Sequence, residues 1–133
     1  MPTCLRFVTP QRDEDSGVRA GFLGIAYDVM RDPDTPHYSA EAIRELIKWF
    51  EKNLAIPDRF TSTTSKGWYR RTGRALSWFK PEAMEAITHA RALAGLLEGE
   101  GVPVTVIRTS RPGTVTFEDD HQIVAEPFAD TAT

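Results

Sequence analysis

The segment from Ala40 to Asn53 carries a stripe of apolar residues at helical spacing. Large apolar side chains recur every three or four positions, at Ile43, Leu46, Ile47, Phe50 and Leu54. Such a stripe predicts an amphipathic helix whose apolar side must be covered by a second layer of the fold. Ser39 is a candidate N-cap, and Pro57 follows the expected end of the helix. The chain is therefore expected to form at least two packed layers.

The rest of the sequence predicts strands and two more helices around this one. Strands are expected over residues 4–8, 75–80, 102–109, 114–118 and 121–126, and helices over residues 18–30 and 81–98. The stretch 75–109 has the length of a βαβ crossover, which predicts two parallel strands. Tight turns are expected to join the last three strands into an antiparallel meander. The order β-α-α-β-α-β-β-β predicts an α+β two-layer sandwich with a mixed sheet and helices mainly on one face.

Alternation within the strands predicts which side chains face the core. Leu5 and Phe7 are expected on one face of the first strand, opposite Cys4, Arg6 and Val8. The final strand is expected at an edge of the sheet, where its apolar residues would invite pairing with a second copy of the chain. A homodimer is therefore one expectation. Residues 1–128 are expected to form a single domain, with 129–133 as a mobile C-terminal tail.

Composition excludes several classes of protein. The sequence has 133 residues, of which 41% are hydrophobic and 26% charged, values typical of a globular domain. No stretch approaches the roughly 20 apolar residues of a membrane span, and charged residues interrupt the N-terminus before a signal peptide could form. With one cysteine, Cys4, the sequence can form no internal disulfide. These features favour a cytoplasmic protein that does not enter a membrane.

A basic, aromatic segment stands out from an otherwise acidic sequence. From residue 59 to 91 there are seven Lys and Arg against two Glu, a balance of +5, while the whole chain carries −3. The candidate binding residues of this segment are Lys66, Trp68, Tyr69, Arg70, Arg71 and Arg74. Cations beside aromatic rings suit an acidic protein surface, a small anion or single-stranded nucleic acid. The alternative is that Trp68 packs onto the core while the arginines are solvated.

A second candidate group lies around a predicted turn. Residues 118–121 offer carboxylates and an imidazole, including Asp120 and His121, but neither a calcium-loop nor a zinc spacing is present. We expect no metal site here, only a polar turn. Arg108 and Arg111 are expected near it across the hairpins, where they would form an exposed cluster of ion pairs.

No set of residues predicts a reaction. Cys4 has no histidine at an informative spacing, no Gly-x-Ser-x-Gly motif occurs, and no cofactor motif is present. The sequence therefore favours a non-enzymatic binding module, adaptor- or inhibitor-like, which contacts an unknown protein partner or an anionic ligand through the basic segment. One alternative is an enzyme or small-ligand protein that binds an anionic substrate, with His121 or Asp120 as proton carrier. A third is a nucleic-acid-binding protein.

Overall fold

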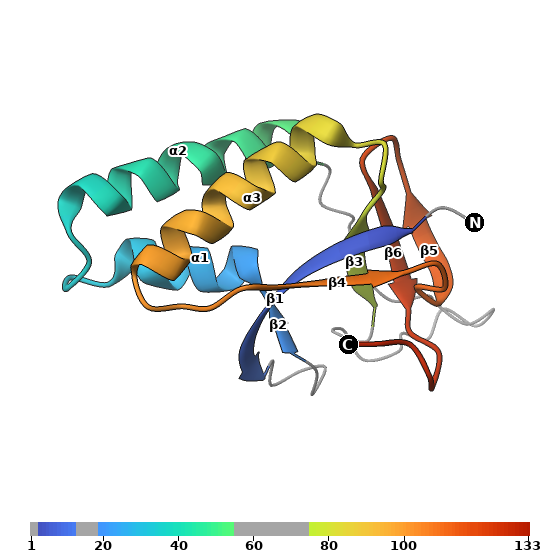
Figure 1. The fold of residues 1–133 in the computed structure, drawn as a ribbon. Coiled ribbons are helices and arrows are strands. Elements are labelled where there is room, and N and C mark those ends of the chain that lie inside the picture. The colour runs from blue at the N-terminus through green and yellow to red at the C-terminus, as the bar shows by residue number, and fades with distance from the viewer. Residues whose placement is uncertain (1–2, 13–18, 55–74) are drawn as a thin grey trace, which may run out of the picture.

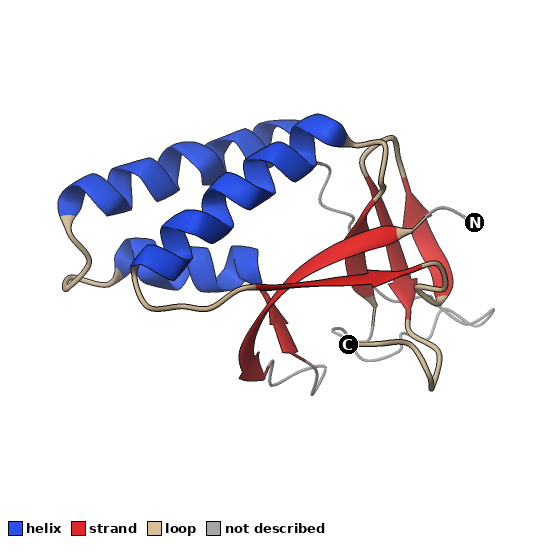
Figure 2. Ribbon diagram, viewed as in Figure 1, coloured by secondary structure: helices blue, strands red, loops and turns tan. Residues whose placement is uncertain are grey.

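The computed structural model describes residues 3–12, 19–54 and 75–133, which form three helices and a six-stranded sheet (Figure 1). The elements in chain order are β1 (Cys4–Arg12), β2 (Arg19–Gly21), α1 (Phe22–Arg31), α2 (His37–Asn53), β3 (Leu76–Phe79), α3 (Met84–Gly99), β4 (Thr105–Thr109), β5 (Thr114–Glu118) and β6 (Gln122–Glu126). The helices gather on one side of the sheet (Figure 2). The predicted α+β class is confirmed.

Strand β1 is paired on both of its edges and contacts three other strands, β2, β3 and β4. Leu5 pairs with Arg108 of β4 on one edge and with Phe79 of β3 on the other. Further along, Val8 pairs with Thr105 of β4 and with Gly21 of β2, so β2 and β3 share one edge of β1. Beyond β3 the sheet continues through β6 to β5.

The topology differs from the expected one in two respects. All the strand pairs among the described residues are antiparallel, so the prediction of a mixed sheet is wrong. The strands β3 and β4 do run in the same direction, but β1 lies between them and pairs with both. In addition, β4 pairs with β1 and not with β5, which reduces the expected meander to the β5–β6 hairpin.

The last strand, β6, is not at an edge of the sheet. It lies between β3 and β5, and its Val124 and Ala125 are fully buried. The prediction of an edge at residues 121–126 is therefore wrong, and the outer strand at this end of the sheet is β5. A homodimer through β6 has no support from this arrangement.

The helix-covered face of the sheet holds a continuous apolar core. Phe7 of β1 and Phe79 of β3 meet Phe22 of α1 and Phe50 of α2, with neighbouring ring centroids 5.1 to 6.4 Å apart. Aromatic rings at such separations gain energy beyond the burial of their surface. Helix α3 contributes small buried side chains at Ala86, Ala90 and Ala94, and Ala83, directly before the helix, is buried as well, as the Ala-rich spacing predicts. No described helix has the length and apolar content that crossing a bilayer requires.

The helices begin at other residues than the sequence suggested. Residues 19–21 form β2 instead of the first helical turn of α1. Helix α2 starts at His37 behind Pro36, so Ser39 lies inside the first turn and donates to Glu100 Oε2 at 2.9 Å. Helix α3 starts at Met84, three residues after Pro81. The hydroxyl of Ser39 thus ties α2 to the end of α3 and is not a cap.

The opposite face of the sheet holds a smaller core. Its buried apolar residues are Cys4, Val8, Leu76, Trp78 and Ile107. The guanidinium of Arg6, which projects from the same face of β1, is buried as well, and its Nη2 donates to the carbonyl of Arg19 at 3.0 Å. The indole Nε1 of Trp78 has no hydrogen-bond acceptor among the described residues. This face therefore combines apolar packing with buried polar groups.

Candidate functional site

The six residues of the basic segment lie outside the described residues. Their role as a binding surface stays a prediction. The described chain resumes at Ala75 and enters β3, where Leu76 pairs with Ala125 of β6. The start of β3 is thus next to the end of β6, and the chain beyond β6 leads directly to the group of residues around Arg111.

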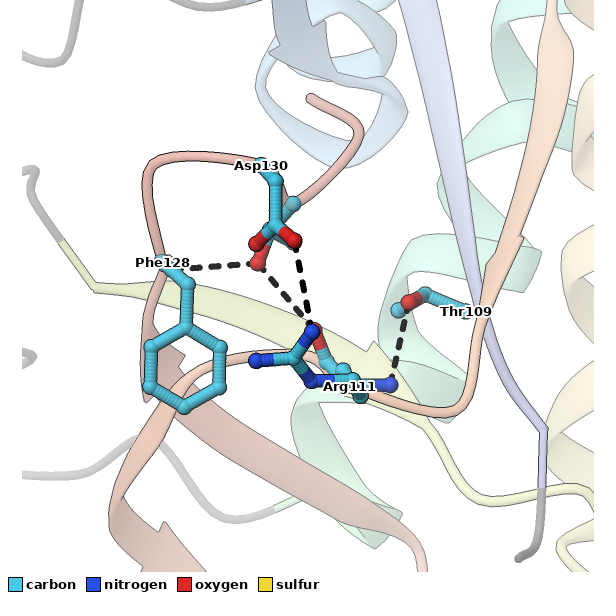
Figure 3. Close-up of polar contacts among 5 residues, drawn as sticks. Thr109, Arg111, Phe128 and Asp130 are labelled. Carbon is cyan, nitrogen blue, oxygen red and sulfur yellow. Dashed lines mark hydrogen bonds and ion pairs between the residues drawn. The ribbon is translucent and has the colours of Figure 1, made fainter.

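We call this group the Arg111 cluster; it consists of Thr109, Arg111, Phe128, Asp130 and Thr131 (Figure 3). The guanidinium of Arg111 lies 5.1 Å from the centre of the Phe128 ring, and its Nη1 is 3.3 Å from Asp130 Oδ2. The ring of Phe128 and the guanidinium are drawn side by side in Figure 3. A guanidinium within about 6 Å of a ring centroid is attracted by the ring, by about 0.5–1 kcal/mol at an exposed site.

Backbone contacts fix the cluster from both sides. The N–H of Arg111 donates to Thr109 Oγ1 at 3.0 Å, and the hydroxyl of Thr131 donates to the carbonyl of Arg111 at 3.1 Å. That hydroxyl also accepts from the N–H of Phe128 at 3.0 Å. Gly113 completes the turn with φ of 132°, and a Cβ there would clash with the backbone carbonyl of Glu126. The connection between β4 and β5 is therefore locked to the chain that follows β6.

The cluster is accessible. The side chains of Arg111 and Asp130 are 64% and 71% exposed, and Phe128 is 39% exposed. An exposed ion pair contributes little to stability and exchanges readily. Asp130 can therefore give up Arg111 to a competing carboxylate or phosphate, while Phe128 keeps the guanidinium in place. The arrangement is suited to contact with an anion or an acidic surface.

The acidic turn lies at the other end of β5 from Arg111. Asp119 Oδ1 accepts from the N–H of His121 at 2.8 Å, and Asp120 is exposed. Glu118 pairs with Lys80, whose Nζ is 2.6 Å from Oε2. Hydrogen bonding to Glu118 raises the pKa of Lys80, with the charges of Glu118, Glu82 and Asp120 adding to the effect.

The expected ion-pair cluster between this turn and the two arginines is therefore wrong. Arg111 pairs with Asp130, and Arg108 is exposed on β4, a strand that pairs with β1 and not with β5. The expectation failed because it assumed a β4–β5 hairpin. Of the secondary candidates, Arg111 therefore lies beside Asp130. Asp120 and His121 lie near Lys80, whose backbone N–H donates to the carbonyl of His121.

No metal or nucleophilic centre emerges from the described part of the chain. It contains no group of three or more His, Cys, Asp or Glu side chains placed to hold a metal ion. Cys4 is buried, and this burial, together with the nearby charges of Glu82 and Glu118, raises the pKa of its thiol. A raised pKa disfavours the reactive thiolate.

The sequence reasoning missed the contribution of the end of the chain. Residues 129–133 were expected to be a mobile tail, yet Asp130 and Thr131 contact Arg111, and Arg19 Nε donates to the backbone oxygen of Thr133 at 3.2 Å. Their mobility stays a prediction. The one available signal was Phe128, an aromatic residue two positions after the last strand, since aromatic residues are rare in segments that contact nothing.

No family model, no curated protein and no solved structure matches this chain. Function is therefore inferred from the chain's own residues.

Proposed function

We propose that this protein is a small binding module that contacts an acidic partner at the end of the sheet where β3 begins. The contact surface would combine the basic segment of residues 66–74 with the Arg111 cluster. The observation that carries the proposal is the guanidinium of Arg111, which lies over the Phe128 ring and is exposed in a turn that hydrogen bonds hold in place. The Arg111 cluster thus combines a cation with an aromatic ring. The basic segment has the same two residue types next to each other in its sequence.

Connectivity supports joining the two into one surface. Arg74 is bonded to Ala75, and Leu76 pairs with Ala125, three residues before Phe128. Each residue spans at most about 3.6 Å of extended chain. The basic segment and the Arg111 cluster are therefore both joined, through only a few residues, to the paired residues Leu76 and Ala125. The basic segment would supply the net positive field that favours an acidic partner, and the Arg111 cluster would add one guanidinium whose carboxylate partner, Asp130, is exposed.

The proposal is tested with a fluorescently labelled polyglutamate peptide and its binding anisotropy at low and moderate salt. The triple variant Arg70/Arg71/Arg74→Glu is expected to abolish binding, and Arg111→Glu to weaken it about tenfold. Arg91→Glu, an exposed arginine on α3, is the matched control and should lower affinity far less. Equal effects of the Arg111 and Arg91 variants would remove the Arg111 cluster from the surface, and full binding by the triple variant would remove the basic segment.

The same titration with a single-stranded oligonucleotide examines the nucleic-acid alternative. Because phosphate contacts release counterions, binding to nucleic acid would fall steeply with salt and exceed binding to the peptide. Capture from a lysate with and without nuclease then identifies the class of partner. An acidic protein recovered after nuclease and lost in the triple variant is the result expected from the proposal.

A further inference from the structure

A basic depression lies between α1 and α2, on the helical layer. It has a volume of about 540 Å³, and the two neighbouring helices that form it are seen at the back of the helical layer in Figure 1. Pockets that bind small molecules usually measure about 300–1,000 Å³. Its lining contains three cations, from Arg31, Arg44 and Lys48, and one carboxylate, from Glu51. The lining side chains alone therefore carry +2, and Glu41 and Glu45 lie beside the lining cations Arg44 and Lys48.

The carboxylate in the depression already has a partner. Tyr27 donates its hydroxyl to Glu51 Oε1 at 3.0 Å, and Arg31 lies over the Tyr27 ring at 5.3 Å. Burial and the hydrogen bond to Glu51 raise the pKa of Tyr27 above its ordinary value of 10.0. Tyr27 thus holds one carboxylate oxygen of Glu51, and its ring lies under the Arg31 guanidinium.

The two cations of α2 are held loosely. Arg44 Nε is 3.6 Å from Glu41 Oε1, and Lys48 Nζ is 3.7 Å from Glu45 Oε1. Charge-assisted hydrogen bonds are shorter, about 2.7–2.9 Å. The side chains of Arg44 and Lys48 are 47% and 63% exposed, so both can turn toward an incoming anion. Exposed pairs of this kind contribute little, and replacing them costs correspondingly little.

We propose that this depression binds a phosphate monoester that carries a small organic body. A phosphate monoester has a charge of about −2 near neutral pH, which matches the +2 of the lining. Two arginines offer the planar forks that bind phosphate oxygens in pairs. Inorganic phosphate would fill only a small part of the volume, whereas the buried side chain of Ile47 and the half-buried Met30 provide an apolar floor for an organic group.

The site is tested with phenyl phosphate as the probe, followed through the backbone amide signals of the nitrogen-15-labelled protein. Phenyl phosphate is expected to shift amide signals within residues 27–31 and 44–51. Phenol, which lacks the phosphate, and inorganic phosphate, which lacks the ring, are expected to bind more weakly. Absence of shifts in these two segments up to about 10 mM phenyl phosphate, a concentration that detects even weak complexes, would overturn the proposal.

Two variants should change the affinity in opposite directions. Arg44→Gln removes a cation and is expected to weaken phenyl phosphate binding about tenfold, whereas Glu51→Gln removes the competing carboxylate and is expected to strengthen it several-fold. Arg91→Gln, outside the depression, is the control and should change the affinity less than about twofold. Weaker binding by Glu51→Gln, or an equal effect of Arg44→Gln and Arg91→Gln, would contradict the assignment. None of these residues belongs to the Arg111 cluster, so this proposal and the proposed function can fail independently.

Discussion

The two faces of the sheet are stabilised in different ways, although the same strands build both. On the helix-covered face, Leu5 and Phe7 of β1 pack into a core of aromatic and aliphatic side chains from all three helices. On the opposite face, Cys4 and Val8 of the same strand surround the buried guanidinium of Arg6. Because the pleat sends alternate residues to opposite sides, one strand serves two cores of unequal polarity.

The difference teaches where this fold is sensitive to substitution. Apolar packing is non-directional, so the helix-covered face depends on the volume of its side chains. The opposite face and the β5–β6 end depend on directed contacts: the hydrogen bonds of the Arg111 cluster, the close approach at Gly113 and the ion pair of Lys80 with Glu118. Removing volume should therefore matter most on the first face, and changing backbone geometry or charge on the second.

The largest effect is expected from Phe22→Ala on the helix-covered face. The Phe22 ring lies 5.1 Å from that of Phe7 and 6.1 Å from that of Phe50, and the residue is 4% exposed. Its truncation leaves a cavity, so the free energy of unfolding in urea should fall by about 3–5 kcal/mol. Tyr38→Ala is the control, because Tyr38 is 77% exposed, and it should change this quantity by less than about 0.5 kcal/mol. Equal losses of unfolding free energy in Phe22→Ala and Tyr38→Ala would show that the stability of the helix-covered face does not depend on its packed volume.

Gly113→Ala should have the next largest effect and act on the opposite side of the comparison. Its φ of 132° is disfavoured for a residue with a Cβ, and the added atom would meet the Glu126 carbonyl. We expect the free energy of unfolding to fall by about 2–4 kcal/mol. Gly95→Ala in α3 is the matched control, with no atom within 4 Å of the added Cβ, and should stabilise the protein by up to about 1 kcal/mol. If Gly113→Ala and Gly95→Ala changed the free energy of unfolding in the same direction, the turn at Gly113 would not be restricted by its φ and by the Glu126 carbonyl.

Helical positions were predictable from the sequence because they depend on local spacing. The stripe from Ile43 to Phe50 and the small residues of α3 both lie in the core as predicted, and the alternation in β1 correctly divides its residues between the two faces. These signals need no knowledge of distant partners. The first turn of α1 was wrong because Gly21, at the end of β2, pairs with Val8, a contact that periodicity cannot reveal.

Strand neighbours were not predictable in the same way. A crossover from β3 to β4 fixes their relative direction but not whether another strand separates them, and here β1 does. The error carried over to the candidate site, since Arg111 was assigned to the acidic turn and in fact pairs with Asp130. The sequence thus indicated the types of residue at the site but not which of them meet.

Trp78→Phe sharpens the comparison with a smaller expected effect. Trp78 is fully buried on the opposite face, and its Nε1 finds no acceptor in the described part of the chain. The variant loses packing but also removes a buried donor without an acceptor, so these effects should largely cancel and change the free energy of unfolding by less than about 1 kcal/mol. A loss above about 2 kcal/mol would mean that the indole N–H donates to a group outside the described residues. The opposite face would then contain a further buried hydrogen bond.

The smallest effect is expected from Glu118→Gln, and its signature is its dependence on pH. The hydrogen bond to Glu118 raises the pKa of Lys80 in the folded protein above its ordinary value of 10.5. A raised lysine pKa stabilises the fold fully below the unfolded value, and this stabilisation is lost as the pH rises through the folded value. The unfolding free energy of the unaltered protein should therefore exceed that of Glu118→Gln by a constant amount from neutral pH to about pH 9.5, and the difference should shrink above about pH 10.5.

The ion pair of Lys48 with Glu45 provides the comparison for this effect on the helical layer. Its side chains are 63% and 71% exposed and 3.7 Å apart, whereas those of Lys80 and Glu118 are 17% and 50% exposed and 2.6 Å apart. Glu45→Gln should therefore change stability less than Glu118→Gln does, since exposed pairs contribute little. Urea unfolding of both variants between pH 7 and pH 11 measures the contrast. If Glu45→Gln proved the more costly change, the directed contacts that matter would lie on the helical layer, and the division between the two faces would be wrong.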